Sequence, residues 1–416
     1  MQPVAVPLTT RQVLRHPSVR SLLIANFLLY AGVALQAAAL FKQAYDITGH
    51  EADLGWIGLC EFLPAALLVL VTGSLADRVN RKLIAFFAIG IELLATIALL
   101  VYSLGEPTEV GPLFVIAFLY GIGRAFAAPA TRAMPPMVAP EGALPKVIAL
   151  YSATWTGAII IGPALSGLLY AIDPWVAYAT TAALISVALW YLGTVRFLRQ
   201  PDPVDPNERP TFRSAVEGLV FIRRTPILLA AISLDLFAVL FGGAVALLPA
   251  IAEDRLGVGD VAYGLLRAAP GVGAAAMAIL LAARPIVRGV GRSLMIAVAV
   301  FGVATVMLGV TRTYWVAFLA LVVLSAADMV SVFIRGSLVP LVTPDEKRGR
   351  VLAVENVFIG ASNELGAFES GVAARLFGTV ASVVIGGTMT LGVVAATAWR
   401  VPALRQLRRI EAPPRD

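Results

Sequence analysis

Ionisable side chains inside long apolar stretches are the residues of this chain best suited to chemistry. Nine positions share this setting: Glu61, Glu92, Arg124, Asp235, Arg267, Asp328, Glu364, Glu369 and Arg375. At the centre of a lipid bilayer a charge costs at least ~2.5–3.5 kcal/mol, so each of these groups needs a partner, a wet cavity or a neutral form. The chemistry to expect is therefore proton binding by carboxyls and the making and breaking of ion pairs.

Asp235 is the strongest candidate for reversible proton binding. It follows Ile232-Ser-Leu and precedes Leu236-Phe, about nine residues into an apolar stretch. Such surroundings favour the neutral form of a carboxyl and bring proton exchange toward neutral pH. A structural, hydrogen-bonded aspartate is an equally open interpretation. Glu364 and Glu369, close together in one glycine-rich stretch, are the next candidates.

Two pairs of these charges coincide when the second half of the chain is overlaid on the first. Arg124 falls on Asp328 at an offset of 204 residues, and Glu61 falls on Arg267 at an offset of 206. Both pairs are opposite in sign, which predicts that they approach one another across a pseudo-two-fold axis. The alternative is pairing within one half, for example between Glu92 and Arg124.

The overall composition requires these residues to be carried by membrane-spanning helices. The chain has 416 residues, of which 59% are hydrophobic and 14% charged, too few charges to cover a water-soluble surface. Its single cysteine and two histidines argue against a disulfide framework, a zinc site or histidine-based catalysis. We therefore expect no metal and no cofactor.

Twelve apolar stretches are long enough to cross ~30 Å of hydrocarbon as helices. They cover residues 19–41, 54–75, 83–104, 112–134, 147–171, 174–192, 226–252, 262–283, 294–310, 314–338, 351–378 and 380–398. Arginine and lysine collect at alternate loops, which is the positive-inside pattern and not a nucleic-acid-binding stripe. This pattern predicts cytoplasmic termini, and the polar first residues predict no cleavable signal peptide.

A repeated passage indicates that the protein consists of two similar halves. A passage that begins at Arg132 contains a charged turn and a glycine-spaced apolar stretch. The same pattern recurs about 204 residues later, beginning at Arg335. We predict six-helix halves at residues 1–195 and 226–416, joined by a cytoplasmic linker at 196–225. The end of that linker, residues 211–224, has the pattern of an amphipathic helix lying in the headgroup layer.

A charged turn joins the second and third predicted spans. It contains Gly73, Asp77, Arg78, Arg81 and Lys82, with Asn80 at a position suited to a left-handed backbone conformation. On spacing alone, the turn could simply be a basic anchor that sets topology.

This turn resembles the loop signature of the major facilitator superfamily, with Asn80 in place of its second glycine. Gly157, Gly162, Pro163 and Gly167 in the fifth span are similar to the glycine-proline motif of that superfamily's antiporters. The whole chain most resembles bacterial efflux members of the enterobactin-exporter or transmembrane secretion effector kind. The resemblance implies that Asp77 secures a cytoplasmic gate against the start of span eleven. The chain departs from the pattern in span four, whose outer half lacks the arginine common in antiporters.

These features predict a proton-coupled exporter of a small amphipathic organic compound, working by alternating access in the inner (plasma) membrane as a monomer. Polar and aromatic residues that could line its cavity are Asn26, Tyr30, Gln36, Phe237 and Phe241, although such residues often only pack. An uptake symporter or a facilitator is the alternative. A scramblase or a membrane enzyme is less expected, because no nucleophile–base cluster is visible and no ATP-binding Walker sequence occurs.

Overall fold

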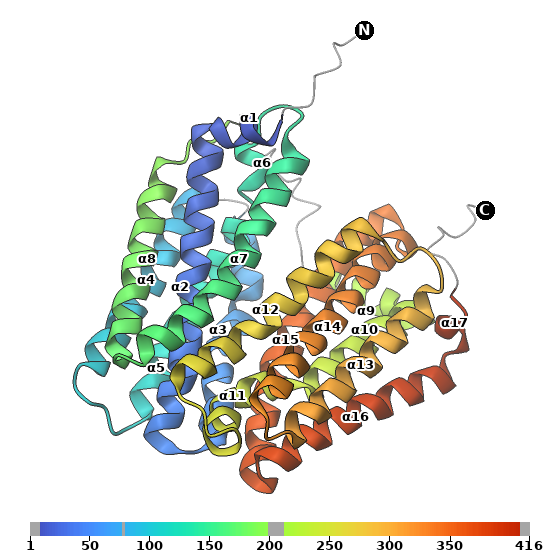
Figure 1. Ribbon diagram of the computed structural model, residues 1–416. Helices are drawn as coiled ribbons and strands as arrows, with labels where there is room; N and C mark the ends of the chain where they lie inside the picture. The colour runs from blue at the N-terminus through green and yellow to red at the C-terminus, as the bar shows by residue number, and fades with distance from the viewer. Residues whose placement is uncertain (1–8, 77–79, 199–211, 408–416) are drawn as a thin grey trace. The chain divides into compact units, whose positions relative to one another are not determined.

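The computed structural model of the protein describes residues 9–76, 80–198 and 212–407, and its regular secondary structure there is entirely helical (Figure 1). The first group of helices is α1 Thr10–Arg15, α2 Pro17–Thr48, α3 Glu51–Ala76, α4 Arg81–Ser103, α5 Gly111–Arg132, α6 Pro135–Val138, α7 Leu144–Tyr170 and α8 Pro174–Thr194. The second group is α9 Phe212–Arg224, α10 Pro226–Phe241, η2 Gly243–Leu247, α11 Leu248–Ala250, η3 Ile251–Arg255, α12 Asp260–Ala283, α13 Val290–Val310, α14 Tyr314–Val342, α15 Asp345–Phe377, α16 Thr379–Arg400 and α17 Pro402–Arg405.

Ten helices in the described part of the chain are long and apolar enough to cross a membrane. Each coincides with one of the predicted spans, and the segment from α10 to η3 counts as one of them. The two other predicted spans, 54–75 and 351–378, lie on α3 and α15. Helix α15 carries Glu355, Glu364 and Glu369 together with two serines and two asparagines, so it is more polar than the ten. The predicted number of twelve spans and the cytoplasmic placement of both termini remain predictions.

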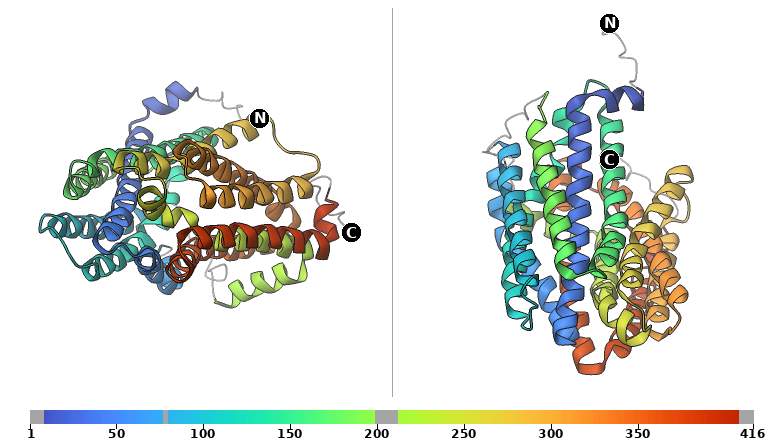
Figure 2. Two further views of the ribbon diagram at one scale, coloured as in Figure 1. Left: turned by 60° about the horizontal axis from the view of Figure 1, so that its bottom comes forward. Right: turned by 60° about the vertical axis from the view of Figure 1, so that its left-hand side comes forward.

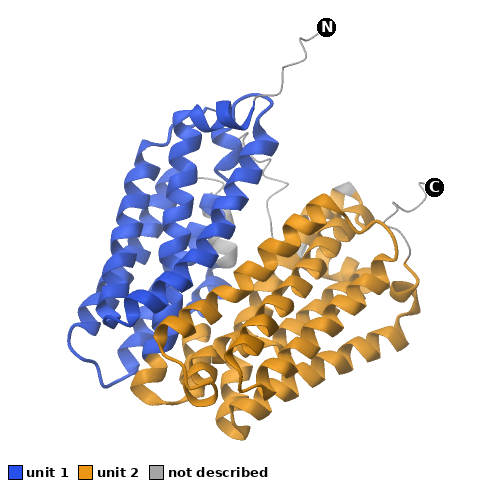
Figure 3. Cartoon of the chain, viewed as in Figure 1, with its two compact units in different colours: residues 1–43, 60–209 blue, residues 44–59, 210–416 orange. Residues whose placement is uncertain are grey.

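The helices divide into two compact units (Figure 3). Unit 1 comprises residues 1–43 and 60–209, and unit 2 comprises residues 44–59 and 210–416. The end of α2 and the start of α3 therefore belong with the second group of helices. Within unit 2, the Tyr45 hydroxyl donates to the Asp254 carboxylate, and the Thr379 hydroxyl donates to Glu51 at 2.9 Å.

The same helix pairings occur in both units, as expected for a duplicated fold. In unit 1, α4 packs along α5 and α8, and in unit 2, α13 packs along α14 and α16. The elements of the second set begin 203 to 209 residues after those of the first. Within each unit the long helices run side by side in both views of Figure 2. This agreement supports the duplication that the sequence indicates.

Helix α9 lies on the first turns of α15 within unit 2. Gly218 of α9 sits so close to α15 that an added Cβ would be 2.8 Å from the Arg350 carbonyl oxygen. An ion pair of 2.5 Å joins Arg350 to Glu217, and the Lys347 ammonium lies 5.2 Å from the centre of the Phe221 ring. The predicted amphipathic helix is thus present, with Ile222 buried in a small apolar cluster. Its placement in the headgroup layer remains a prediction.

Candidate proton-binding and gating residues

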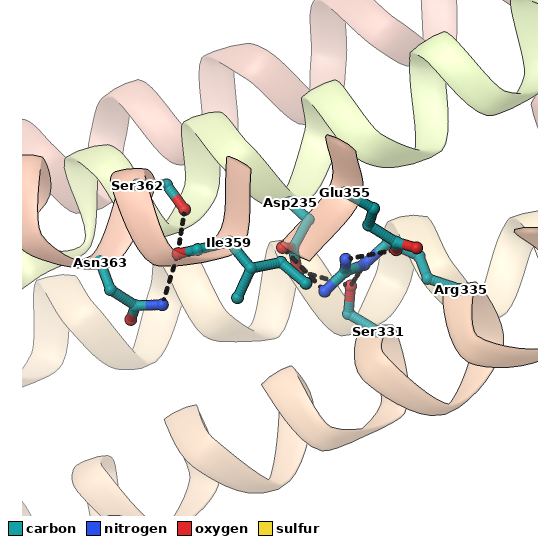
Figure 4. Close-up of polar contacts among 7 residues, drawn as sticks. All are labelled: Asp235, Ser331, Arg335, Glu355, Ile359, Ser362 and Asn363. Carbon is teal, nitrogen blue, oxygen red and sulfur yellow. Dashed lines mark hydrogen bonds and ion pairs between the residues drawn. The ribbon is translucent and has the colours of Figure 1, made fainter. Parts of the chain in front are cut away.

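A buried arginine in unit 2 binds two carboxylates at once (Figure 4). Arg335 of α14 contacts Asp235 of α10 through Nη2 at 2.8 Å and Glu355 of α15 through Nη1 at 3.0 Å. The Ser331 hydroxyl, one turn earlier in α14, donates to the second Asp235 oxygen at 3.0 Å. We call Asp235, Ser331, Arg335 and Glu355 the unit 2 charge cluster.

The unit 2 charge cluster is almost completely removed from solvent. The side chains of Arg335, Asp235 and Glu355 are 3%, 6% and 8% exposed. A planar guanidinium is suited to this task, because its fork of N–H donors can bind two carboxylates in fixed directions. With all three groups ionised, however, the cluster carries a net charge of −1 in an apolar bundle. One added proton makes it neutral.

Helical spacing explains how the cluster is assembled. Asp328, Ser331 and Arg335 are separated by three and four residues, so they lie on one face of α14. Asp328 is a half-buried neighbour on which both Asp235 and Arg335 act electrostatically. Glycines bring the partner helix close, since Gly366 of α15 packs against the Val239 and Leu240 carbonyls of α10. The structure thus gives the Asp235 carboxylate two partners, Arg335 and Ser331, that the sequence did not predict.

A second group of charges lies in unit 1. Arg124 of α5 forms an ion pair of 3.4 Å with Glu61 of α3, and Arg124 is the more exposed partner. Glu92 of α4 is buried, and both Arg124 and Glu61 act on it electrostatically. The pairing seen inside unit 1 is therefore between Arg124 and Glu61, where the sequence suggested Glu92 as one possibility.

The other predicted intramembrane charges are found within unit 2. Arg267 of α12 donates to the Val245 carbonyl at 2.6 Å. Glu364 and Glu369 of α15 are half-buried, and the Glu364 carboxylate lies near Gly58. The proposed approach of Arg124 to Asp328, and of Glu61 to Arg267, stays a prediction.

The glycine-proline motif packs α7 tightly against α2. A Cβ added at Gly162 would lie 2.6 Å from the Ala31 carbonyl oxygen and 2.8 Å from the Ala34 Cβ. Pro163 and Gly167 are buried beside it, and Pro163 lies in the interior of the continuous helix α7. Gly157 is less constrained, because its nearest neighbour would be a Phe27 ring carbon at 3.6 Å. The predicted close-packing role fits Gly162 far better than Gly157.

This difference gives a testable prediction. Gly162→Ala should destabilise the protein by about 1–3 kcal/mol, because the added methyl group forces apart two packed backbones. The matched variant Gly157→Ala should change stability by less than about 1 kcal/mol, because the space exists and alanine favours a helix. Thermal unfolding of both purified variants in detergent measures the effect. Equal melting temperatures for the two variants would contradict the packing seen at Gly162.

The sequence of the chain matches the Major Facilitator Superfamily over residues 22–367. The chain belongs to this superfamily. Its members are transporters, so the protein is a multi-pass membrane transporter and not an enzyme. The expected family resemblance is confirmed.

Relatives of the chain include proteins named as exporters. The chain is 29% identical over 233 residues to a macrolide efflux protein A of Streptococcus pyogenes, an alignment that covers 54% of this chain and 56% of the relative. The chain thus spans about half the length of that relative. It is 25% identical over 407 residues to the enterobactin exporter EntS of Salmonella choleraesuis, covering 96% and 95% of the two chains. Among solved structures, a bacterial homologue of the human lysosomal transporter Spinster has a similar fold, with a TM-score of 0.69, 17% identity and coverage of 94% and 96%.

The superfamily loop signature is described only at its ends. Asp77 and Arg78 lie outside the described residues, and Gly73 ends up in the last turns of α3. Asn80 has a φ of −55°, so the expected left-handed conformation is wrong. Its side chain instead caps α4 by accepting from the Lys82 backbone N–H at 2.9 Å, a role that requires an extended-type backbone. Arg81 is the first residue of α4.

Lys82 connects the beginning of α4 to the end of α8. Its ammonium donates to the carbonyls of Gly193 and Val195, each at 2.7 Å. These carbonyls lie at the C-terminal end of α8, where unpaired oxygens and the helix dipole favour a positive charge. The gating role of the signature remains a prediction, and the structure gives Lys82 a definite capping contact.

The predicted substrate-contacting residues have differing environments within the superfamily fold. Asn26 is buried and donates to Thr154 at 2.9 Å, and Gln36 is buried and accepts from Thr96 at 2.6 Å. Both polar side chains therefore connect helices of unit 1. Phe237 and Phe241 of α10 stack with ring centres 6.1 Å apart, and Tyr30 is half-buried. Contact of these five residues with substrate remains a prediction.

Proposed function

We propose that this transporter exports a small amphipathic organic compound in exchange for protons, and that the unit 2 charge cluster binds the proton. The single observation that carries the proposal is the arrangement of Asp235 and Glu355 on one buried Arg335. The direction of transport is supported by the full-length similarity to an enterobactin exporter and the partial similarity to a macrolide efflux protein.

The energetics of the cluster suggest how proton binding could be tied to transport. An uncompensated charge inside the bilayer costs at least ~2.5–3.5 kcal/mol, so a net −1 cluster is stable only where water reaches it. Protonation of one carboxyl removes this cost and permits closure around the cluster. Alternating exposure of the cluster would thus load a proton on one side of the membrane and release it on the other. Rocking of the two halves is the motion that the superfamily fold permits.

The two named substrates provide the first compounds to test. Macrolides and enterobactin are transported by relatives, and each is taken here as a candidate substrate of this chain. We propose the inner (plasma) membrane as the location and a monomer as the active form.

Inverted membrane vesicles containing the protein provide a direct test. A proton gradient, acidic inside, is established and followed with a quenched amine dye, and a macrolide or enterobactin is then added. We expect at least one of the two compounds to collapse the gradient, because protons leave as the compound enters. Vesicles without the protein serve as the control. Transport of either compound at the same rate with and without the gradient would contradict proton coupling.

A further inference from the structure

Glu92 of α4 is a buried carboxyl that the proposed function does not use. It is 3% exposed, and its Oε2 atom has no hydrogen-bond partner among the described residues. The hydroxyl of Tyr120, which is 4% exposed, is likewise without a hydrogen bond there. Two unsatisfied polar atoms in one helix bundle are costly unless a further group binds to them.

Close helix packing places charged partners around this carboxyl. A Cβ added to Gly123 of α5 would lie 2.8 Å from Cγ of Glu92, and one added to Gly121 would collide with the Glu61 carbonyl of α3. Arg124 follows directly and pairs with Glu61. Three neighbouring helices therefore bring Glu61, Glu92 and Arg124 together by means of two glycines.

The ionisable groups that face Glu92 come from few elements. Arg124 of α5 and Glu61 of α3 act on it, and Glu92 is the charged group with the strongest effect on the Tyr120 hydroxyl. Tyr30 of α2 also acts on Tyr120. Helix α8, which packs on α4, contains no charged residue. Among the described residues, Arg124 and Glu61 are thus the charged groups found to act on Glu92.

The two units each contain a group of the same composition, although the helices that carry the carboxyls do not correspond in the duplication. Each has two carboxyls and one guanidinium contributed by three helices: Glu61, Glu92 and Arg124 in unit 1, and Asp235, Glu355 and Arg335 in unit 2. The two arginines differ in how many carboxylates they bind. Arg335 binds both carboxylates at 3.0 Å or less, whereas Arg124 binds Glu61 at 3.4 Å and an oxygen of Glu92 has no hydrogen-bond partner among the described residues.

We propose that Glu92 is a second proton-binding site, located in unit 1 and distinct from the unit 2 charge cluster. A proton on Glu92 makes the group of three neutral, since Arg124 then balances Glu61. Movement of the partly exposed Arg124 guanidinium toward Glu92 stabilises the carboxylate and releases the proton to water. The transport cycle then carries more than one proton. This inference extends the proposed proton-coupled export but can be tested without transport.

A proton suits this site better than a metal cation or an amine. A bare sodium ion requires several oxygen ligands, and a neighbouring guanidinium repels it. An amine of a substrate would need space beside Glu92, which is buried among close-packed helices. A proton needs only one carboxyl oxygen, and Oε2 of Glu92, which has no hydrogen-bond partner among the described residues, provides it.

Infrared difference spectroscopy of the purified protein tests the inference. When the pH is raised from about 5 to about 9, the infrared spectrum of the wild type should lose the C=O stretching band of a protonated carboxyl. That band should be missing from Glu92→Gln and should remain in Asp235→Asn and in the surface control Glu217→Gln. If Glu92→Gln does not fold, Arg124→Gln provides the second test, because loss of the guanidinium should keep the band to a higher pH.

Three results would overturn the inference. One is a spectrum of Glu92→Gln identical to that of the wild type. Another is a Glu92 band that stays constant over the whole pH range, which would make the residue a permanently neutral structural acid. The third is loss of the band on adding sodium at constant pH, which would indicate a sodium site. Transport that does not depend on pH would contradict the proposed function. It would leave the infrared test of Glu92 unaffected.

Discussion

Arg335→Met is expected to lower the free energy of unfolding by about 3–5 kcal/mol, the usual cost of removing one partner from a buried ion pair. The substitution retains a side chain of similar length and leaves Asp235 and Glu355 buried without their counter-charge. Unfolding of the purified protein in detergent, followed by heat or denaturant, measures the loss. Transport should also be abolished, because the cluster can no longer hold one proton and one ion pair.

Two further variants separate charge from shape in this prediction. Arg335→Lys keeps the charge but lacks the fork, so it should recover only part of the stability. Adding Asp235→Asn and Glu355→Gln to Arg335→Met removes both buried charges and should restore most of the lost stability. A single Arg335→Met protein as stable as the wild type would show that the cluster is not a buried ion network.

Asp235→Asn is expected to separate substrate movement from the proton gradient. The amide keeps the size of the side chain and can accept from Ser331, but it cannot release a proton. Exchange of labelled for unlabelled substrate at equal pH should therefore continue, while accumulation driven by a pH gradient should fall at least about tenfold, which corresponds to about 1.4 kcal/mol. Proteoliposomes loaded with a macrolide or enterobactin allow both measurements on the same preparation.

Glu217→Gln is the matched control for this carboxyl-to-amide change. Glu217 pairs with Arg350 at an exposed position of unit 2, and its side chain is 46% exposed. Exposed pairs contribute about 0–1 kcal/mol, so gradient-driven accumulation should be close to that of the wild type. Gradient-driven accumulation by Asp235→Asn at the level of this control would remove Asp235 as the proton carrier.

The helices and the duplication were predictable because hydropathy and length determine them directly. Ten of the twelve predicted stretches are apolar helices of spanning length, since a helix in lipid must satisfy its own backbone. The helical conformation of the polar α15 also follows from its sequence, but its depth in the membrane does not.

The partners of Asp235 were not predicted, and the reason is physical. Arg335 and Glu355 lie near the ends of their predicted spans, where long charged side chains ordinarily extend to water. The three- and four-residue spacing of Asp328, Ser331 and Arg335 was the available signal. Which carboxyl of another helix meets the guanidinium depends on helix packing, which one sequence does not reveal.

The duplicated passage is asymmetric at its first residue. Arg132 in unit 1 is exposed, whereas its counterpart Arg335 in unit 2 is buried between two carboxylates. The backbone repeat was visible in the sequence, while this difference in environment was not. The local conformation of Asn80 was also misjudged, because an N-cap and a left-handed turn attract the same residue type.

Proton release on substrate binding tests the central claim most directly. A macrolide or enterobactin is added to the detergent-solubilised protein in weakly buffered solution, and a pH-sensitive dye reports the protons set free. The wild type should release about one proton more per bound molecule than Asp235→Asn, because the cluster of Asp235, Arg335 and Glu355 loses its proton when substrate binds. Equal release by the two proteins, at equal substrate binding, would contradict the account.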